Sequence, residues 1–215
     1  METLVQVALF AVTLSTGERA AVAQIDIEDG WHIYWENPGQ SGYPTELEGD
    51  CVLKTVYAPP HRFRMPGDIL NYGYEGTVRL FGSGHCLPGD EVTLSWLSCR
   101  EDTCIPGEYH GSLQELPADR ISAVEEEWAL NARAKAISRT DTGWVIALKT
   151  GRHSTIEYFP TAQIEAQGPE PVVTAGFWRQ KWTLKGEMPI AQSEKVVVRL
   201  QNRGKEEILI YTAEE

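Results

Sequence analysis

Residues 91–109 read EVTLSWLSCREDTCIPGEY and decide more of the fold than any other stretch of the chain. Apolar and polar residues alternate over 92–96, and a period of two is typical of a strand that buries one face. Cys99 and Cys104 then flank four polar residues, and a Pro-Gly pair follows closely. We therefore expect the chain to fold back here, which brings the two sulfur atoms within bonding distance across a tight turn.

The spacing of Cys99 and Cys104 favours a redox role over a structural one. A disulfide that closes so short a loop stabilises a fold less than one that links distant segments. Both redox states of such a pair can keep much the same fold, which suits a switch. An inert structural clip and a metal site are the alternatives that the spacing alone leaves open.

Acidic residues surround this cysteine pair. Glu101 and Asp102 lie between the two cysteines, and Glu108 follows shortly after. Arg100 is the one basic residue nearby. Because carboxylates disfavour a neighbouring thiolate, we expect the three acidic residues to raise the pKa of the thiols. The reduced pair would then react mainly when a docked partner supplies a more favourable environment.

The other two cysteines, Cys51 and Cys86, lie near predicted strand ends or loops. A second, structural disulfide between them and a pair of buried free thiols are both open interpretations. Together with His85, the four cysteines offer enough ligands for a zinc ion. Zinc sites usually draw on paired C-x₂₋₄-C motifs, however, and this chain has only one near-motif of that kind. We therefore predict no metal site.

Short strands separated by turns make up most of the remaining sequence. Turn-forming pairs such as Asp-Gly and Pro-Gly recur between them. Many short antiparallel strands at this spacing indicate β-sandwiches rather than an α/β sheet. The predicted strands are residues 5–12, 21–27, 77–81, 91–97, 144–148, 182–184, 195–200 and 207–211.

One segment, residues 122–137, breaks this pattern and predicts a helix. It is rich in Ala and Glu, and Ser122 with Glu125 fits a capping box. Its first half is acidic and its second half contains Arg133 and Lys135. That distribution of charge complements a helix dipole.

The helix and the placement of the cysteines predict two domains. We expect an N-terminal domain over residues 1–116, a helical linker over 117–142 and a second domain over 143–215. All four cysteines lie in the first of these. The predicted fold class is therefore all-β, with two sandwich domains joined by a short linker that contains a helix.

Composition excludes several kinds of partner. The net charge of −12 argues against nucleic acid, because a phosphate backbone repels an acidic surface. No apolar run approaches the ~20 residues of a membrane helix. Residues 1–15 have Glu2 where a signal peptide has basic residues, so we interpret them as a first strand. If the protein is exported, its signal peptide is expected to be absent from this sequence.

Four blocks of sequence stand in order in the first half of the chain: GWHIYWENPGQSG (30–42), YAPPHRF (57–63), NYGYEG (71–76) and WLSC followed by CIPGE (96–108). The first resembles the GWH-x-YW-x-NPG-x-SG signature of DsbD-like and ScsB-like thiol:disulfide interchange proteins. The whole set is similar to the N-terminal region of that family. The second half resembles the family more loosely, through residues 143–144 and 158–160.

This resemblance implies an immunoglobulin-like sandwich in the bacterial periplasm that acts as a thiol:disulfide oxidoreductase without a cofactor. Cys99 and Cys104 would receive electrons from the thioredoxin-like and transmembrane domains of the same full-length protein. They would pass these electrons to thioredoxin-fold or other oxidised periplasmic disulfide proteins. We favour Cys104 as the attacking residue because the adjoining residues, Ile105 and Pro106, offer a rigid docking edge.

Members of the family protect their cysteine pair with a cap loop. By position this loop corresponds to residues 71–76, with Tyr74 best placed over the sulfurs and Tyr72 and Glu75 beside it. An aromatic lid excludes water and has to move before a partner can dock. Ordinary cross-strand packing is the alternative for the two tyrosines.

A function without catalysis is the main rival interpretation. Two β-sandwiches stapled by inert disulfides would serve as a binding or adhesion module. That alternative predicts that the Cys99–Cys104 bond resists mild reductants and that its loss strongly destabilises the fold.

Overall fold

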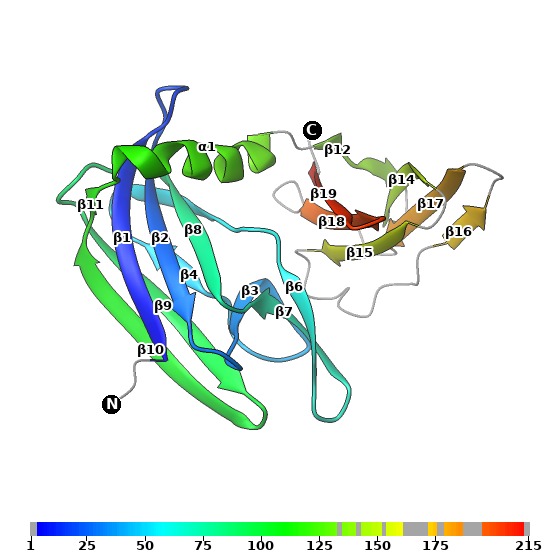
Figure 1. Ribbon diagram of the computed structural model, residues 1–215, viewed down its shortest axis with the longest axis horizontal. Helices are drawn as coiled ribbons and strands as arrows, with labels where there is room; N and C mark the ends of the chain where they lie inside the picture. Colours follow the sequence, from blue (N-terminus) through cyan, green and yellow to red (C-terminus); the bar gives the residue numbers. More distant parts are fainter. Residues whose placement is uncertain are drawn as a thin grey trace. The chain divides into compact units, whose positions relative to one another are not determined.

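The computed structural model describes residues 4–132, 135–140, 143–151, 154–160, 172–175, 179–186 and 195–212. Within these residues the protein is mostly β, with one α-helix. The prediction of a predominantly β protein is therefore confirmed. The chain divides into two compact units, Met1–Ala129 and Leu130–Glu215 (Figure 1). The domain and linker boundaries inferred from the sequence remain predictions.

The first unit contains three sheets and most of the helix. Their strand orders are β11-β1-β2-β8-β5, β10-β9-β4 and β3-β7-β6. The elements are β1 (Val5–Thr13), β2 (Arg19–Ile27), β3 (Ile33–Gly39), β4 (Glu46–Glu48), β5 (Val52–Val56), β6 (His61–Met65), β7 (Ile69–Tyr74), β8 (Thr77–Gly84), β9 (Glu91–Arg100), β10 (Thr103–Ser112), β11 (Gln114–Glu115) and α1 (Ala118–Ala132).

The alternating sequence pattern explains the burial of these strands. In β2, Ala23, Ile25 and Ile27 are buried, whereas the intervening Gln24 and Asp26 are only half-buried. Successive side chains of a strand point to opposite faces, so this pattern places one face of β2 in the core. The period of two therefore predicted correctly both the strand and its buried face.

The helix α1 packs against the five-stranded sheet through one face. Ile121, Val124 and Trp128, which are spaced three and four residues apart, contribute to the same apolar cluster as strand residues. The ring of Trp128 meets Phe81 of β8 edge-on, with 5.6 Å between ring centroids. No helix in the described ranges is long and apolar enough to cross a membrane.

The predicted start of the helix is wrong by four residues. Because α1 begins at Ala118, Ser122 lies in its second turn and does not cap it. Glu125 instead accepts a hydrogen bond from the backbone N–H of Ser15 at 2.5 Å. Pro117 directly precedes the helix, and the fixed φ of proline suits a helix start without a side-chain cap.

The second unit contains two four-stranded sheets, in the orders β12-β19-β18-β15 and β13-β14-β17-β16. Lys135, which we predicted at the end of the helix, lies in β12, and Arg133 lies outside the described residues. The strands are β12 (Lys135–Ala136), β13 (Ser138–Thr140), β14 (Gly143–Gly151), β15 (Thr155–Pro160), β16 (Val172–Ala175), β17 (Arg179–Gly186), β18 (Lys195–Asn202) and β19 (Lys205–Thr212).

One apolar cluster in this unit draws on both sheets. Ile146 and Leu148 come from β14, whereas Val196 and Val198 come from β18 of the other sheet. Sharing one core means that the two sheets pack face to face. The immunoglobulin-like form of either unit stays a prediction.

Candidate functional site

The cysteine pair lies at the end of the β9–β10 hairpin. Cys99 stands directly opposite Cys104 in the antiparallel ladder, and their Cα atoms are 4.2 Å apart. A disulfide joins them. The next pair of residues closes the hairpin, so its loop contains only Glu101 and Asp102. The chain thus folds back between the cysteines, as the sequence indicated.

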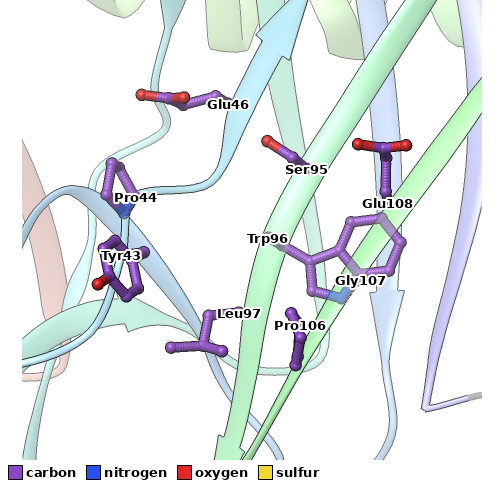
Figure 2. A pocket seen from close by; sticks show the side chains of 9 residues that line it. All are labelled: Tyr43, Pro44, Glu46, Ser95, Trp96, Leu97, Pro106, Gly107 and Glu108. Carbon is purple, nitrogen blue, oxygen red and sulfur yellow. The ribbon is translucent and has the colours of Figure 1, made fainter.

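A groove of about 600 Å³ runs along this hairpin (Figure 2). Residues of β9 and β10 line one wall, and the loop that follows β3 lines the other together with the start of β4. The lining residues are Tyr43, Pro44, Glu46, Ser95, Trp96, Leu97, Pro106, Gly107 and Glu108. The groove begins two residues away from each cysteine, at Leu97 and Pro106.

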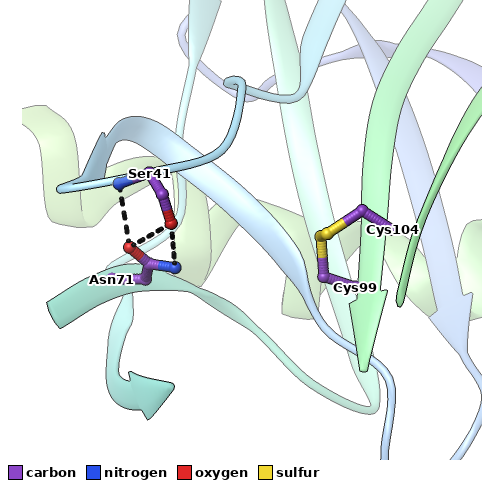
Figure 3. The surroundings of a disulfide bond; sticks show 4 residues. All are labelled: Ser41, Asn71, Cys99 and Cys104. Atoms are coloured by element: carbon purple, nitrogen blue, oxygen red, sulfur yellow. Dashed lines mark hydrogen bonds between the residues drawn. A yellow bond between two sulfur atoms is a disulfide. The ribbon is translucent and has the colours of Figure 1, made fainter. Parts of the chain in front are cut away.

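The two cysteines of the disulfide differ in exposure. Cys99 has 0% of its surface exposed, whereas Cys104 is exposed. Figure 3 shows the sulfur atoms projecting to the side of β9 on which Ser41 and Asn71 lie. A reagent that arrives from solvent therefore meets Cys104 first, and Cys99 is shielded.

The main chain of Cys99 is fixed by His32, the residue just before β3. The N–H of His32 donates to the Cys99 carbonyl at 3.0 Å, and the N–H of Cys99 donates to the His32 carbonyl at 2.9 Å. Residues that exchange both hydrogen bonds lie opposite each other with side chains on the same face. The imidazole of His32 and the sulfur of Cys99 therefore share one face.

Aromatic rings enclose the His32 side chain. Its ring stacks on Phe63 with 5.1 Å between centroids and meets Tyr34 edge-on at 5.2 Å. Within the described residues its Nε2 atom is buried and has no hydrogen-bond partner. Burial lowers the pKa of His32 below its ordinary value of 6.5, because the charged form loses its hydration.

A polar cluster lies on the face of the β3-β7-β6 sheet against which the His32 ring packs. On this face Phe63, which stacks on His32, lies directly opposite Asn71. Asn71 is fully buried, and its Oδ1 accepts a hydrogen bond from the backbone N–H of Ser41 at 3.1 Å (Figure 3). Its Nδ2 donates to the Ser41 hydroxyl at 3.0 Å. Hydrogen bonds from Asn71 and Ser41 to Tyr34 oppose the effect of burial, which raises the pKa of Tyr34. These contacts hold the loop between β3 and β4 in place.

The predicted cap residues lie in strand β7 and in the turn that follows it. Residues 71–74 belong to β7, which pairs with β3 and β6, so the prediction of a loop there is wrong. Tyr72 and Tyr74 alternate along β7 with Asn71, which places their side chains on the face opposite to it. Both tyrosines are buried, and the Tyr74 hydroxyl donates to the Ala58 carbonyl at 2.7 Å. Glu75 is exposed in the turn that follows.

Strand sequence explains this difference. The order Asn71-Tyr72-Gly73-Tyr74 has a period of two, as expected of a strand with different partners on its two faces. Tyr72 meets the Trp35 ring edge-on, with 6.4 Å between centroids. The structure therefore gives the tyrosines cross-strand and core contacts and does not bring them to the face that carries the disulfide.

The charged residues near the disulfide lie in three different places. Glu101 and Asp102 are exposed in the hairpin loop, and Glu101 has a left-handed φ of 50°. The Arg100 guanidinium lies 4.8 Å from the centroid of the Trp31 ring, a cation–π contact. Glu108 lies four residues beyond Cys104, on the same face of β10, and lines the groove.

A second disulfide joins Cys51 to Cys86, and both residues are buried. It connects the turn before β5 to the residues after β8, with a sequence separation of 35. All four cysteines are thus bonded to each other in pairs. Among the described residues, no three His, Cys, Asp or Glu side chains are grouped to hold a metal ion.

Sequence reasoning missed His32, Ser41, Tyr43 and Asn71. His32, Ser41 and Asn71 lie within the sequence blocks quoted above, and Tyr43 directly follows the first of them. The available signal was the placement of the polar residues His32 and Asn71 among aromatic and apolar neighbours. A buried polar side chain requires a partner or a function.

The fold and the site define a class: a protein of two β units whose first unit presents a cross-strand disulfide with one accessible cysteine. The chain matches a family described as "Thiol:disulfide interchange protein DsbD, N-terminal" over residues 2–115, more than half of its length. It therefore belongs to the DsbD N-terminal family.

A solved structure shares this fold, and a second gives a weaker match. The N-terminal periplasmic domain of ScsB from Proteus mirabilis matches with a TM-score of 0.60 and 17% identity, over 100% of this chain and 95% of that one. The reduced DsbD N-terminal domain of Neisseria meningitidis gives a TM-score of 0.41 and 10% identity, over 53% of this chain and 87% of that one. A search of curated proteins gives no match.

Proposed function

We propose that Cys99 and Cys104 carry out thiol–disulfide exchange in the periplasm. The pair would relay electrons from membrane-embedded and thioredoxin-like domains of the same full-length protein to oxidised partner proteins. The observation that carries this proposal is the unequal exposure of the two cysteines in a member of the interchange family. The exposed Cys104 is accessible to a partner, and the buried Cys99 is available to resolve the mixed disulfide.

The exchange proceeds in two steps. The Cys104 thiolate attacks one sulfur of the partner disulfide, the partner S–S bond breaks, and the other partner sulfur leaves as a thiolate that takes up a proton. Cys99 then loses its proton and attacks the Cys104 sulfur, which forms the Cys99–Cys104 bond and releases the second partner thiol. Two electrons pass to the partner, and no cofactor takes part.

The finer architectural predictions belong to this proposal. We infer an immunoglobulin-like form for the first unit and a linker function for residues 117–142. Because Tyr72 and Tyr74 are buried on the other face, a lid that includes Tyr74 and Glu75 would require β7 to rearrange. The acidic pair Glu101 and Asp102 remains a candidate for raising the pKa of the thiols.

Single cysteine variants test the exchange. Cys99→Ala leaves the accessible Cys104 without its resolving partner, so it should trap a stable mixed disulfide with a thioredoxin-fold substrate. Cys104→Ala keeps only the buried cysteine and should trap little. Non-reducing electrophoresis followed by mass spectrometry of the adduct measures both. Trapping by neither variant would rule out the exchange.

The rival binding module, stapled by inert disulfides, makes a different prediction for reduction. The chain carries its own control, because Cys51–Cys86 is buried at both ends whereas Cys99–Cys104 has one exposed cysteine. After equilibration in glutathione buffers, thiol counting should show two reduced cysteines, and peptide mapping should assign them to 99 and 104. Equal resistance of both bonds would favour the binding module.

A further inference from the structure

The groove beside the disulfide has a regular geometry set by strand register. In the β9–β10 ladder Cys99 faces Cys104, and four residues along the strands Ser95 faces Glu108. On the other edge of β9, Ser95 faces Glu46 of β4. Residues that face each other across strands project from the same side of a sheet. Glu46, Ser95 and Glu108 therefore form one row across three strands, on the face that carries the disulfide.

This row is acidic at both ends. Neighbouring strands are about 4.8 Å apart, so the Cα atoms of Glu46 and Glu108 lie on the order of 10 Å apart, with Ser95 between them. Figure 2 shows both carboxylates at the same end of the groove. None of the nine residues that line the groove is basic, and both glutamates are exposed. A cation from outside the chain can thus contact both.

The end of the groove nearer the disulfide is apolar. Leu97 and Pro106 lie between the disulfide and the acidic row, and Tyr43 stands across from them (Figure 2). Tyr43 is 73% exposed, although the loop that carries it is fixed by the Ser41–Asn71 hydrogen bonds. An exposed aromatic ring on a fixed loop is suited to covering an extended segment.

We propose that this groove binds an extended segment of the partner protein that carries Lys or Arg four residues from its reactive cysteine. The inference rests on the exchange function proposed above and names the chemistry of its substrate. The disulfide and the acidic row are separated by four residues of strand, about 14 Å, and an extended partner segment spans the same distance with four residues. Its apolar residues pack on Leu97, Pro106 and Tyr43, and its cation lies between Glu46 and Glu108.

Synthetic peptides test this preference on the reduced full chain. Each peptide has one cysteine as a mixed disulfide with thionitrobenzoate, whose release is followed by absorbance. Cys104 attacks the peptide sulfur and thionitrobenzoate leaves; Cys99 then releases the peptide as a thiol. One set has Lys four residues before or after the cysteine, a second has Glu there, and a third has Lys only two residues away.

One of the two Lys peptides, with Lys either before or after the cysteine, should react about fivefold faster than its Glu counterpart. In it, two exposed ion pairs with Glu46 and Glu108 replace two repulsions. High salt should reduce this ratio. The ratio should fall to about one in the E46Q/E108Q variant and persist in Glu48→Gln, which changes an acidic residue of β4 outside the groove. Moving Lys to two residues from the cysteine should also abolish it.

Two kinetic results would overturn the inference: equal rates for the Lys and Glu peptides, or a ratio that survives in E46Q/E108Q. Dimerisation of the chain through this groove, seen by analytical ultracentrifugation and altered in the same variant, would overturn it as well. The mixed disulfide of glutathione with thionitrobenzoate serves as a control. It distinguishes failure of the inferred segment preference from failure of the proposed exchange function. It is too small to reach the acidic row, so it should react equally with all variants, whereas no reaction at all would contradict the exchange itself.

Discussion

At the scale of residues, His32 is joined to Cys99 of the disulfide by backbone hydrogen bonds. Its two hydrogen bonds with Cys99 involve only main-chain atoms, so every residue except proline can make them at this position. The imidazole itself is buried between Phe63 and Tyr34, and its Nε2 lacks a partner among the described residues. Burying an unpaired polar atom costs about 1–3 kcal/mol, so the side chain is expected to weaken the oxidised fold.

His32 should make the stability of the protein depend on pH. Its folded pKa is lower than the 6.5 of the unfolded chain, so the unfolded state binds more protons as the pH falls through 6.5. The free energy of unfolding should therefore decline below pH 6.5. Urea denaturation at pH 7.5, 6.5 and 5.5 measures this change.

The matched variant is His32→Phe, which keeps an aromatic ring against Phe63 but cannot be protonated. Its free energy of unfolding should fall less between pH 7.5 and 5.5 than that of the parent chain. It should also be at least as stable at pH 7.5, since the unpaired nitrogen is gone. An unchanged pH dependence would show that other groups cause it.

At the scale of elements, the loop between β3 and β4 forms one wall of the groove and depends on Gly42. This glycine has a φ of 99°, and a Cβ atom placed there would collide with the Tyr34 ring. Gly89 has nearly the same φ, 98°, but open space around it. Substituting Gly42 and Gly89 therefore separates the free-energy cost of a left-handed backbone from the cost of the collision with Tyr34.

Gly42→Ala should therefore destabilise the protein more than Gly89→Ala. The left-handed conformation costs roughly 1–2 kcal/mol in both variants. The first variant must also displace the loop or the ring, which should further lower its thermal midpoint and slow its exchange with the Lys peptides. Equal losses of stability in the two variants would mean that the loop or the Tyr34 ring moves aside at no free-energy cost.

The sequence predicted some of the strands correctly but misplaced the start of the helix and the secondary structure of residues 71–74. The alternation of apolar and polar residues predicted β2 and β9, because a strand buried on one face needs apolar residues at every second position. The helix start was misplaced because Ser122 and Glu125 match a capping pattern that an interior turn can also contain. Residues 71–74 of the predicted cap loop form a strand. The resemblance locates residues 71–76 along the chain but does not indicate which face of a sheet each side chain takes.

At the scale of the whole molecule, both disulfides lie in the first unit, and the second unit has a separate apolar cluster. Sequence could predict the cysteine-bearing half and the likeness of this half to a family. It could not pair Cys51 with Cys86 or unite two sheets of the second unit in one core, because such contacts join residues far apart in the chain.

Removing each disulfide should affect the stability of the first unit unequally. Chain-entropy arguments give about 4 kcal/mol for the 35-residue separation of Cys51 and Cys86. They give about 2 kcal/mol for the 5-residue separation of Cys99 and Cys104. Denaturation of the two double Cys→Ala variants compares these losses. A larger loss for the pair at the hairpin end would mark it as a structural staple.

The hydrogen bonds between His32 and Cys99 have one further consequence, for the lifetime of the covalent complex with a partner. They do not involve sulfur, so we expect reduction to leave the backbone of Cys99 where it was. The second thiol then stays at high effective molarity beside the first, and ring closure outcompetes any thiol from solution. Under the proposed exchange function, the protein should release its client quickly, and the mixed disulfide should accumulate only when the resolving cysteine is removed.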